Sequence, residues 1–285
     1  MYTPGSGPPV LFLHGYWHGS WCWAEVLARV TAAGVRALAV DMAGHGLRAR
    51  QPAALIRRPF DAGMLSTEVS PVADVGLDQA AELLVDQMEA LGAGDPVIVV
   101  AHSMGGAVLT RAAQLATGLV AEAVYLTAFM PASGMPATAY VRMPEHEGGL
   151  ALRALVADPS AVGAFRIDVA SPDPGYRQLL RDALYGDVTP AVAEAAIALL
   201  TPDAPARIAL EATVLTPDGW GSAPRTYVVC TQDMTIRPAL QRRFIADSDA
   251  AFPDNPTTVY TLDTAHSPFL SMPSQVADVV LKLGR

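Results

Sequence analysis

The stretch PVIVVAHSMGGAVLTRAAQLA, residues 96–116, is the part of the chain that decides the fold. An apolar, β-favouring run at 96–101 leads through a short turn into a helix-forming run at 107–116. A serine at such a strand-turn-helix junction has a strained backbone, which requires small residues two positions before and after it. Ala101 and Gly105 occupy those positions around Ser103, with alanine replacing the more usual first glycine. The pattern predicts a nucleophile elbow at Ser103; the alternative is a glycine-rich turn with an incidental serine.

Outside this stretch, apolar strand-like runs alternate with segments of helical period. The alternation is typical of an α/β fold in which a mostly parallel central sheet is flanked by helices. Apolar residues recur at helical spacing from Leu77 to Leu91, before a stop at Gly92, and again from Val276 to Leu283. The predicted strands are residues 10–13, 35–40, 96–101, 123–127, 226–230 and 257–262.

One long segment, residues 131–222, interrupts this alternation. Strand-like runs vanish there, and proline and glycine punctuate short apolar helices such as 191–200. We expect a helical cap at 131–222, inserted into a core formed by residues 1–130 and 223–285. Residues 46–75 contain few periodic signals and are expected to form an irregular excursion beside the site.

Composition excludes several classes of function. Half of the 285 residues are hydrophobic (51%) and only 16% are charged, which predicts a large buried core. No apolar run approaches the roughly 20 residues that a membrane-spanning helix needs. A formal net charge of −9 and a pI near 5.0 argue against a nucleic-acid partner, because such binding depends on clustered lysine and arginine.

The cysteines and the N-terminus indicate a reducing compartment. Cys22 and Cys230 are far apart in sequence and show no metal-ligand spacing, so two buried thiols are expected rather than a disulfide. Residues 1–5 show neither a basic region nor the start of an apolar signal segment. We therefore expect a cytoplasmic protein.

A serine hydroxyl needs a base to take its proton and a carboxylate to orient that base. His266 follows the last predicted strand, and Asp233 follows the strand at 226–230. The chain order serine, aspartate, histidine is that of α/β-hydrolases. The sequence therefore predicts a triad of Ser103, Asp233 and His266. Asp263 and Thr127 mark the alternative positions for the acid, in the same loop as His266 and at another strand end.

The loop HGYWHG at 14–19 follows the first strand, and its glycine allows a backbone amide to face the serine. We expect the amides of Tyr16 and Met104 to form the oxyanion hole, because the residue after the nucleophile donates in this fold.

The remaining histidines divide into three groups by local context. His14 and His102 lie beside tight turns and are expected to bond backbone groups. His18 is a candidate for the border of the substrate pocket. His45 and His146 are expected to be exposed loop residues.

Several segments of the chain form a recognisable set: HG at 14–15, HGSWCW at 18–23, AHSMGG at 101–106, AFMP at 128–131, YVVCTQD at 227–233 and GWGS at 219–222, with Pro238 and the pair at 241–242. Together they resemble the plant methylesterase and hydroxynitrile lyase family and its bacterial esterase relatives. The resemblance covers nearly the whole chain and implies a carboxylesterase without metal or cofactor, acting on small or medium esters. It places the triad and the oxyanion donors on the residues named above, and an apolar pocket at Gly15, Trp17, His18 and Phe129.

The departures from this family all concern the expected pocket. Tyr16 and Trp17 are bulkier than the residues usual there, residues 46–75 are longer than in the plant members, and residues 137–181 diverge most. The lyase members resemble one another in having a hydroxyl residue after the first-loop histidine and a lysine after the catalytic histidine. Gly15 and Ser267 stand at those positions here, which favours ester hydrolysis.

Two further alternatives concern the class of the protein. Epoxide hydrolases and haloalkane dehalogenases share the fold but use an aspartate nucleophile, which Ser103 disfavours. Other relatives are small-molecule receptors that keep the triad, since a fold does not determine a function. The expected partner is a small-molecule ester, and a homodimer is the assembly considered.

Overall fold

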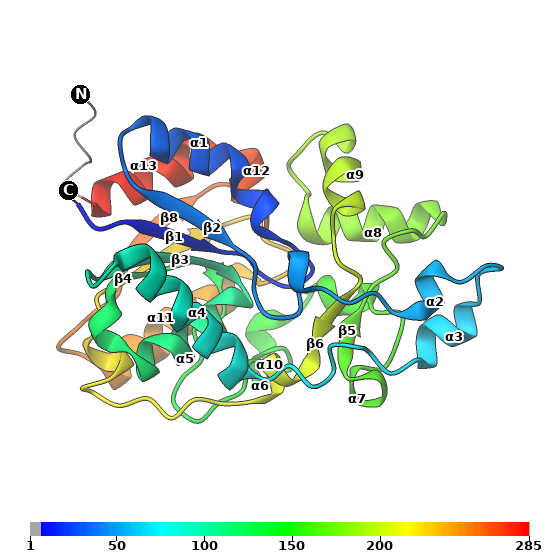
Figure 1. Cartoon of the computed structure of the whole chain (residues 1–285), viewed down its shortest axis with the longest axis horizontal. Coiled ribbons are helices and arrows are strands. Elements are labelled where there is room, and N and C mark those ends of the chain that lie inside the picture. The colour runs from blue at the N-terminus through cyan, green and yellow to red at the C-terminus, as the bar shows by residue number, and fades with distance from the viewer. Residues whose placement is uncertain (1–6, 285) are drawn as a thin grey trace.

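The computed structural model describes residues 7–284, which form a central sheet with helices on both faces (Figure 1). All neighbouring strands of the six-stranded sheet run parallel, in the order β2-β1-β3-β4-β7-β8. The expected α/β architecture is therefore confirmed. The strands are β1 (Val10–Leu13), β2 (Ala37–Val40), β3 (Val97–Ser103), β4 (Val120–Ala128), β7 (Arg225–Cys230) and β8 (Thr258–Leu262).

The central strands are mostly apolar because both of their faces are buried. In β3, Val97 and Val99 pack into one core, whereas Ile98 and Val100 pack into the core on the other face. The helices of the first face are α4 (Leu77–Gly92), α5 (Gly105–Leu115) and α11 (Pro238–Ala251); those of the second are α1 (Ala24–Ala32), α12 (Pro268–Ser271) and α13 (Pro273–Leu283). The stop expected at Gly92 falls one residue later, because Ala93 takes the left-handed conformation, with φ of 52°.

The chain between β4 and β7, here called the insertion, holds five α-helices and two short strands within residues 131–222. The helices are α6 (Ala137–Tyr140), α7 (Pro159–Val162), α8 (Pro174–Leu184), α9 (Pro190–Ala198) and α10 (Ala206–Leu210). The expectation that strands are absent here is wrong, since β5 (Ala164–Arg166) pairs antiparallel with β6 (Asp203–Pro205). Three residues are too few for a periodic signal, and a buried ion pair joins the two strands, with Arg166 Nε 2.7 Å from Asp203 Oδ1. The division into core and cap domains stays a prediction.

The shorter elements connect this framework. The 3₁₀ helices are η1 (Ser20–Trp23), η2 (Gly46–Arg48), η3 (Thr117–Leu119), η4 (Pro144–His146), η5 (Ala151–Ala154) and η6 (Trp220–Ser222). Residues 46–75 also contain α2 (Ala53–Ile56) and α3 (Ala62–Thr67), which project from one edge of the molecule near β5 and α7 (Figure 1).

The sequence also led to expectations about the cysteines, membrane-spanning helices and an N-terminal signal segment. Both cysteines are buried free thiols, as expected. Among residues 7–284, no helix has the length and apolarity needed to cross a bilayer. The expectation about a signal segment concerns residues 1–5, which lie outside the described part of the chain.

Candidate active site

Ser103 is the last residue of β3 and stands at the turn into α5. Its φ of 53° is in the left-handed region, which costs a non-glycine residue on the order of 1 kcal/mol or more. The turn fits only because its neighbours are small: a Cβ on Gly105 would lie 2.6 Å from the His14 carbonyl oxygen. The strand-turn-helix geometry predicted for this stretch is thus present, and it brings the serine to the carboxyl edge of the sheet.

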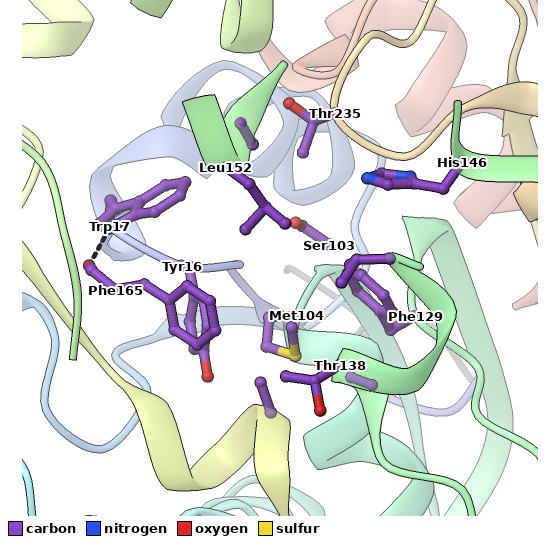
Figure 2. A pocket seen from close by; sticks show the side chains of 14 residues that line it. Tyr16, Trp17, Ser103, Met104, Phe129, Thr138, His146, Leu152, Phe165 and Thr235 are labelled. Atoms are coloured by element: carbon purple, nitrogen blue, oxygen red, sulfur yellow. Dashed lines mark hydrogen bonds between the residues drawn. The ribbon is translucent and has the colours of Figure 1, made fainter. Parts of the chain in front are cut away.

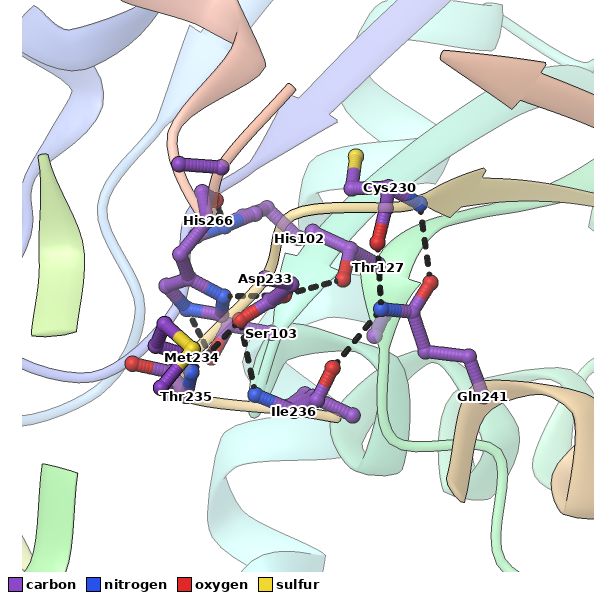
Figure 3. Close-up of polar contacts among 12 residues, drawn as sticks. His102, Ser103, Thr127, Cys230, Asp233, Met234, Thr235, Ile236, Gln241 and His266 are labelled. Carbon is purple, nitrogen blue, oxygen red and sulfur yellow. Dashed lines mark hydrogen bonds and ion pairs between the residues drawn. The ribbon is translucent and has the colours of Figure 1, made fainter. Parts of the chain in front are cut away.

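His266 connects Ser103 to Asp233 (Figure 3). Its Nε2 lies 3.1 Å from Ser103 Oγ, and its Nδ1 lies 2.7 Å from Asp233 Oδ2. Both His266 and Asp233 are fully buried. The sequence-predicted residues therefore meet in one chain of hydrogen bonds, although they are separated by 163 and 33 positions along the chain.

The two alternative positions for the acid have other partners. Asp263 is exposed and bonds Thr231 and Gln232, which lowers the pKa of its carboxyl group. Thr127 lies at the end of β4 and donates its hydroxyl to Asp233 Oδ2 at 2.5 Å. Thr127 therefore supports Asp233 rather than replacing it.

The Asp233 carboxylate is held from both of its oxygens. Oδ1 accepts the backbone amides of Thr235 and Ile236 at 2.6 and 2.8 Å, and Oδ2 accepts Thr127 and His266. The buried Gln241 side chain on α11 closes the same loop by donating to the carbonyls of residues 230 and 236 (Figure 3). These bonds fix the carboxylate in the one orientation that reaches the imidazole.

The loop that carries His266 is held by Asp187, which sequence reasoning missed, and by His102. Asp187 of the insertion accepts the Ala265 amide at 2.9 Å and also bonds the Thr264 hydroxyl. His102 donates Nε2 to the His266 carbonyl at 2.7 Å. His102 was expected to bond a backbone group, but nothing in the local sequence around Asp187 indicates its role.

The expected oxyanion loop lies against Ser103. A Cβ on Gly15 would be 2.4 Å from Ser103 Cβ, so only glycine allows this approach. His14 and His18 hold the loop through hydrogen bonds: their Nδ1–H groups donate to the carbonyl oxygens of Gly15 and Tyr16, at 2.7 and 2.9 Å. Within residues 7–284, the amides of Tyr16 and Met104 donate to no protein acceptor. Met104 is also the N-cap of α5, where the helix dipole favours a negative charge.

A cavity of about 550 Å³, including the space at its mouth, opens beside Ser103 (Figure 2). Its walls are mostly apolar, and the lining residues are Tyr16, Trp17, Ser103, Met104, Phe129, Ala137, Thr138, Val141, His146, Ala151, Leu152, Phe165, Ala209 and Thr235. Trp17 and Phe129 line it as expected, whereas Gly15 and His18 do not. The expectation that residues 46–75 border the site is wrong, because none of them lines this cavity.

His18 is excluded from the cavity by its own hydrogen bonds. Its Nδ1 donates to Tyr16, and its Nε2 accepts the Tyr185 hydroxyl at 2.8 Å, so the ring packs behind the loop. Gly15 has no side chain to offer, and its backbone is covered by Ser103. His18 and Gly15 therefore shape the loop at 14–19 without lining the cavity themselves.

The expectation that His45 and His146 are exposed is wrong. His45 is fully buried against Tyr16, with ring centroids 5.8 Å apart, and His146 is buried and lines the cavity. The position of His45 between two glycines and of His146 in the expected cap had suggested surface loops, but packing against other segments covers both rings.

Burial keeps the histidines beneath the site neutral. It lowers the pKa of His14 and of His18 to about 3 and that of His45 to about 4, because a charged ring would lose its hydration. Burial and the neighbouring His266 hold the pKa of His102 well below its usual range. Within the described residues, no group of three or more His, Cys, Asp or Glu side chains is arranged to hold a metal ion.

The chain is similar in sequence and in fold to several known proteins. The model of the "Alpha/beta hydrolase family" matches residues 10–279. Methylesterase 9 of Arabidopsis thaliana is 26% identical, with 96% of each chain covered, and the probable esterase PIR7A of Oryza sativa subsp. indica is 28% identical, covering 98% of this chain and 97% of the relative. The crystal structure of a pyrethroid hydrolase from Sphingobium faniae superposes with a TM-score of 0.73 at 21% identity, covering 97% of both chains. That structure is similar in fold.

Proposed function

The chain belongs to the alpha/beta hydrolase family, and we propose that it is a serine carboxylesterase with Ser103 as nucleophile, His266 as general base and Asp233 as the orienting carboxylate. One observation carries the proposal: a chain of hydrogen bonds runs from Asp233 through His266 to Ser103, next to the amides of Tyr16 and Met104, which have no acceptor within residues 7–284. The relatives named methylesterase and esterase support the same reaction class.

Acylation begins with proton transfer from Ser103 to His266. The serine Oγ attacks the ester carbonyl carbon while its proton moves to His266 Nε2, 3.1 Å away. Asp233 accepts a hydrogen bond from Nδ1–H of the same ring, which fixes the tautomer with a free Nε2 and stabilises the imidazolium that forms. The carbon–oxygen bond to the alcohol then breaks, and the alcohol leaves with the proton from Nε2.

Negative charge develops on the carbonyl oxygen during the attack. In this proposal the amides of Tyr16 and Met104 donate to that oxygen, and the N-terminus of α5 adds its partial positive charge. A single donor of this kind typically contributes about 10²–10³ in kcat.

Deacylation repeats the same steps with water. His266 takes a proton from a water molecule, the hydroxide attacks the acyl carbon, and the proton returns to Ser103 as the acid leaves. The substrate proposed is a small or medium ester with an apolar or aromatic body, because Trp17, Phe129 and Phe165 line the cavity.

Cleavage of a cyanohydrin has less support than ester hydrolysis. A departing cyanide needs a compensating positive charge in a desolvated site, and no Lys or Arg is among the residues that line the described cavity. Two backbone donors, by contrast, suit the tetrahedral intermediate of an ester.

The test compares the wild-type protein with Ser103→Ala on p-nitrophenyl acetate and on small aromatic methyl esters. We expect turnover by the wild type and a fall in kcat of roughly 10⁴–10⁶-fold in the variant, since triad members act as a unit. A fluorophosphonate probe should label the wild type but neither Ser103→Ala nor heat-denatured protein. Ester turnover of more than a tenth of wild type in folded Ser103→Ala would refute the assignment. If the protein released cyanide from mandelonitrile but did not hydrolyse the esters, the proposed function would change from esterase to lyase.

A further inference from the structure

The cavity beside Ser103 contains few polar groups that are free to meet a ligand. Tyr16, Trp17 and Thr235 each donate to a backbone carbonyl of the protein, at 2.7, 2.8 and 2.7 Å. Their polar atoms therefore serve the packing of the walls, and only their apolar surfaces are left for a substrate.

His146 is the exception among the ring-bearing side chains of this wall. Neither of its nitrogens bonds another group within residues 7–284, although the residue is only 8% exposed and Nδ1 is completely enclosed. Its ring points from the insertion into the cavity (Figure 2). Buried polar groups are nearly always paired, because an unpaired one loses its hydration without compensation. A ligand cannot reach the enclosed Nδ1, but Nε2 also has no partner among these residues and belongs to a side chain that lines the cavity, where a ligand group can pair it.

The surrounding chain holds this ring in place. Glu145 beside it in η4 forms an ion pair with Arg243 of α11, with oxygen and nitrogen 3.1 Å apart. A Cβ on Gly149 would lie 2.5 Å from His146 Nε2, so the backbone at Gly149 packs closely against the ring. Because Nδ1 is enclosed, Nε2 at the tip of the ring is the nitrogen available to a ligand.

The charge state of the ring decides which ligand group it suits. Burial lowers the pKa of His146, with a smaller contribution from Arg237, while Asp233 opposes the shift. The ring is therefore neutral at neutral pH, and each nitrogen either donates or accepts according to the tautomer. A hydroxyl group can both donate and accept, so it pairs with either tautomer.

We infer that His146 Nε2 binds a hydroxyl group of the substrate, so that this cavity selects apolar esters carrying a hydroxyl over the same esters carrying a methyl. The inference rests on the proposed function for the position of the ester at Ser103. To the proposed ester hydrolysis it adds a substrate class: an aromatic or similarly apolar ester that carries one hydroxyl group on the part of the molecule that lies next to the insertion.

The experiment measures binding without turnover, in the Ser103→Ala background. The ligands are the three methyl hydroxyphenylacetates, with the hydroxyl in the ortho, meta or para position, and the three methyl-substituted analogues. For at least one ring position, the hydroxyl ligand should bind about 10-fold more tightly than its methyl analogue, the size expected for one hydrogen bond.

Three variants at position 146 then locate the hydrogen bond. His146→Leu should reduce the hydroxyl-to-methyl ratio to about 1. His146→Gln can place an amide near the former Nε2 and should restore part of the preference, whereas His146→Asn places its amide near Nδ1 and should not. Thr138→Val tests the hydroxyl of another residue of the wall: loss of the preference in Thr138→Val, with its retention in His146→Leu, would assign the hydrogen bond to Thr138 and overturn the inference.

The inference is overturned if no ring position prefers the hydroxyl, if none of the six ligands binds, or if His146→Leu keeps the preference. An unfolded His146→Leu sample leaves the comparison of the Gln and Asn variants to decide. Turnover by the protein with Ser103 intact is measured separately, so a failed hydroxyl preference with active ester hydrolysis removes the inference and leaves the esterase proposal standing.

Discussion

Mild acid should destabilise this protein strongly, because four neutral histidines are buried beneath the site. His14, His18, His45 and His102 are all fully buried, and each has a pKa lowered chiefly by that burial. In the unfolded chain each ring takes up a proton near pH 6.5. The stability due to each neutral ring is therefore fully present above pH 6.5 and is lost as the pH falls toward the lowered folded pKa.

The magnitude follows from proton linkage. Between pH 7 and 5.5 the folded rings stay neutral while the unfolded ones become charged, which costs about 1.2 kcal/mol for each histidine. Four such rings amount to about 5 kcal/mol, against a typical total stability of roughly 5–15 kcal/mol. Relief of charge repulsion opposes this loss, because the formal net charge of −9 shrinks as the pH approaches the pI near 5.0.

The assay is urea unfolding followed by tryptophan fluorescence at pH 7.5, 6.5 and 5.5, with the free energy of unfolding extrapolated to water. His45→Gln removes one ring without adding a charge, so it should lower the pH dependence by about a quarter, whatever its effect on stability at pH 7.5. A free energy of unfolding that stays constant or rises from pH 7.5 to 5.5 would refute the reasoning. An unchanged slope in His45→Gln would remove that residue from the group.

The remaining predictions concern the geometry around Ser103, each measured as kcat on p-nitrophenyl acetate. Asp233→Asn should lower kcat by roughly 10³–10⁴-fold through the wrong histidine tautomer, whereas Asp263→Asn should change it by less than about threefold; the reverse order would move the acid to Asp263. Thr127→Val removes the hydroxyl that donates to Asp233 and should lower kcat about 10-fold at similar KM, and wild-type kcat would show that this bond does not orient the carboxylate. Gly15→Ala would place a methyl 2.4 Å from Ser103 Cβ and should lower kcat at least 100-fold in a folded protein; retained activity would contradict the close approach.

Local sequence was sufficient for the elbow and for the six strands of the central sheet, but not for the short strands β5 and β6. The small residues around Ser103 and the continuous apolar run before it are consequences of a tight turn after a buried strand, and both act within a few residues. The alternation of apolar and helical segments predicted the six strands of the central sheet, and the observed strands differ from the predicted ranges only at their ends. The order Ser103, Asp233, His266 could be predicted because each residue follows a recognisable strand.

The tertiary structure decided which side chains meet. Asp233 and Asp263 both follow strands, and only the register of β7 beside β8 brings Asp233 to His266 while leaving Asp263 in solvent. His146 lies in a glycine-rich, acidic stretch typical of a surface loop, yet packing of η4 near α11 buries it in the cavity wall. Asp187 reaches the loop of His266 from 78 positions away. Sequence patterns report local conformation and the face that is buried, whereas contacts between distant segments depend on the packing of the whole chain, which periodicity does not encode.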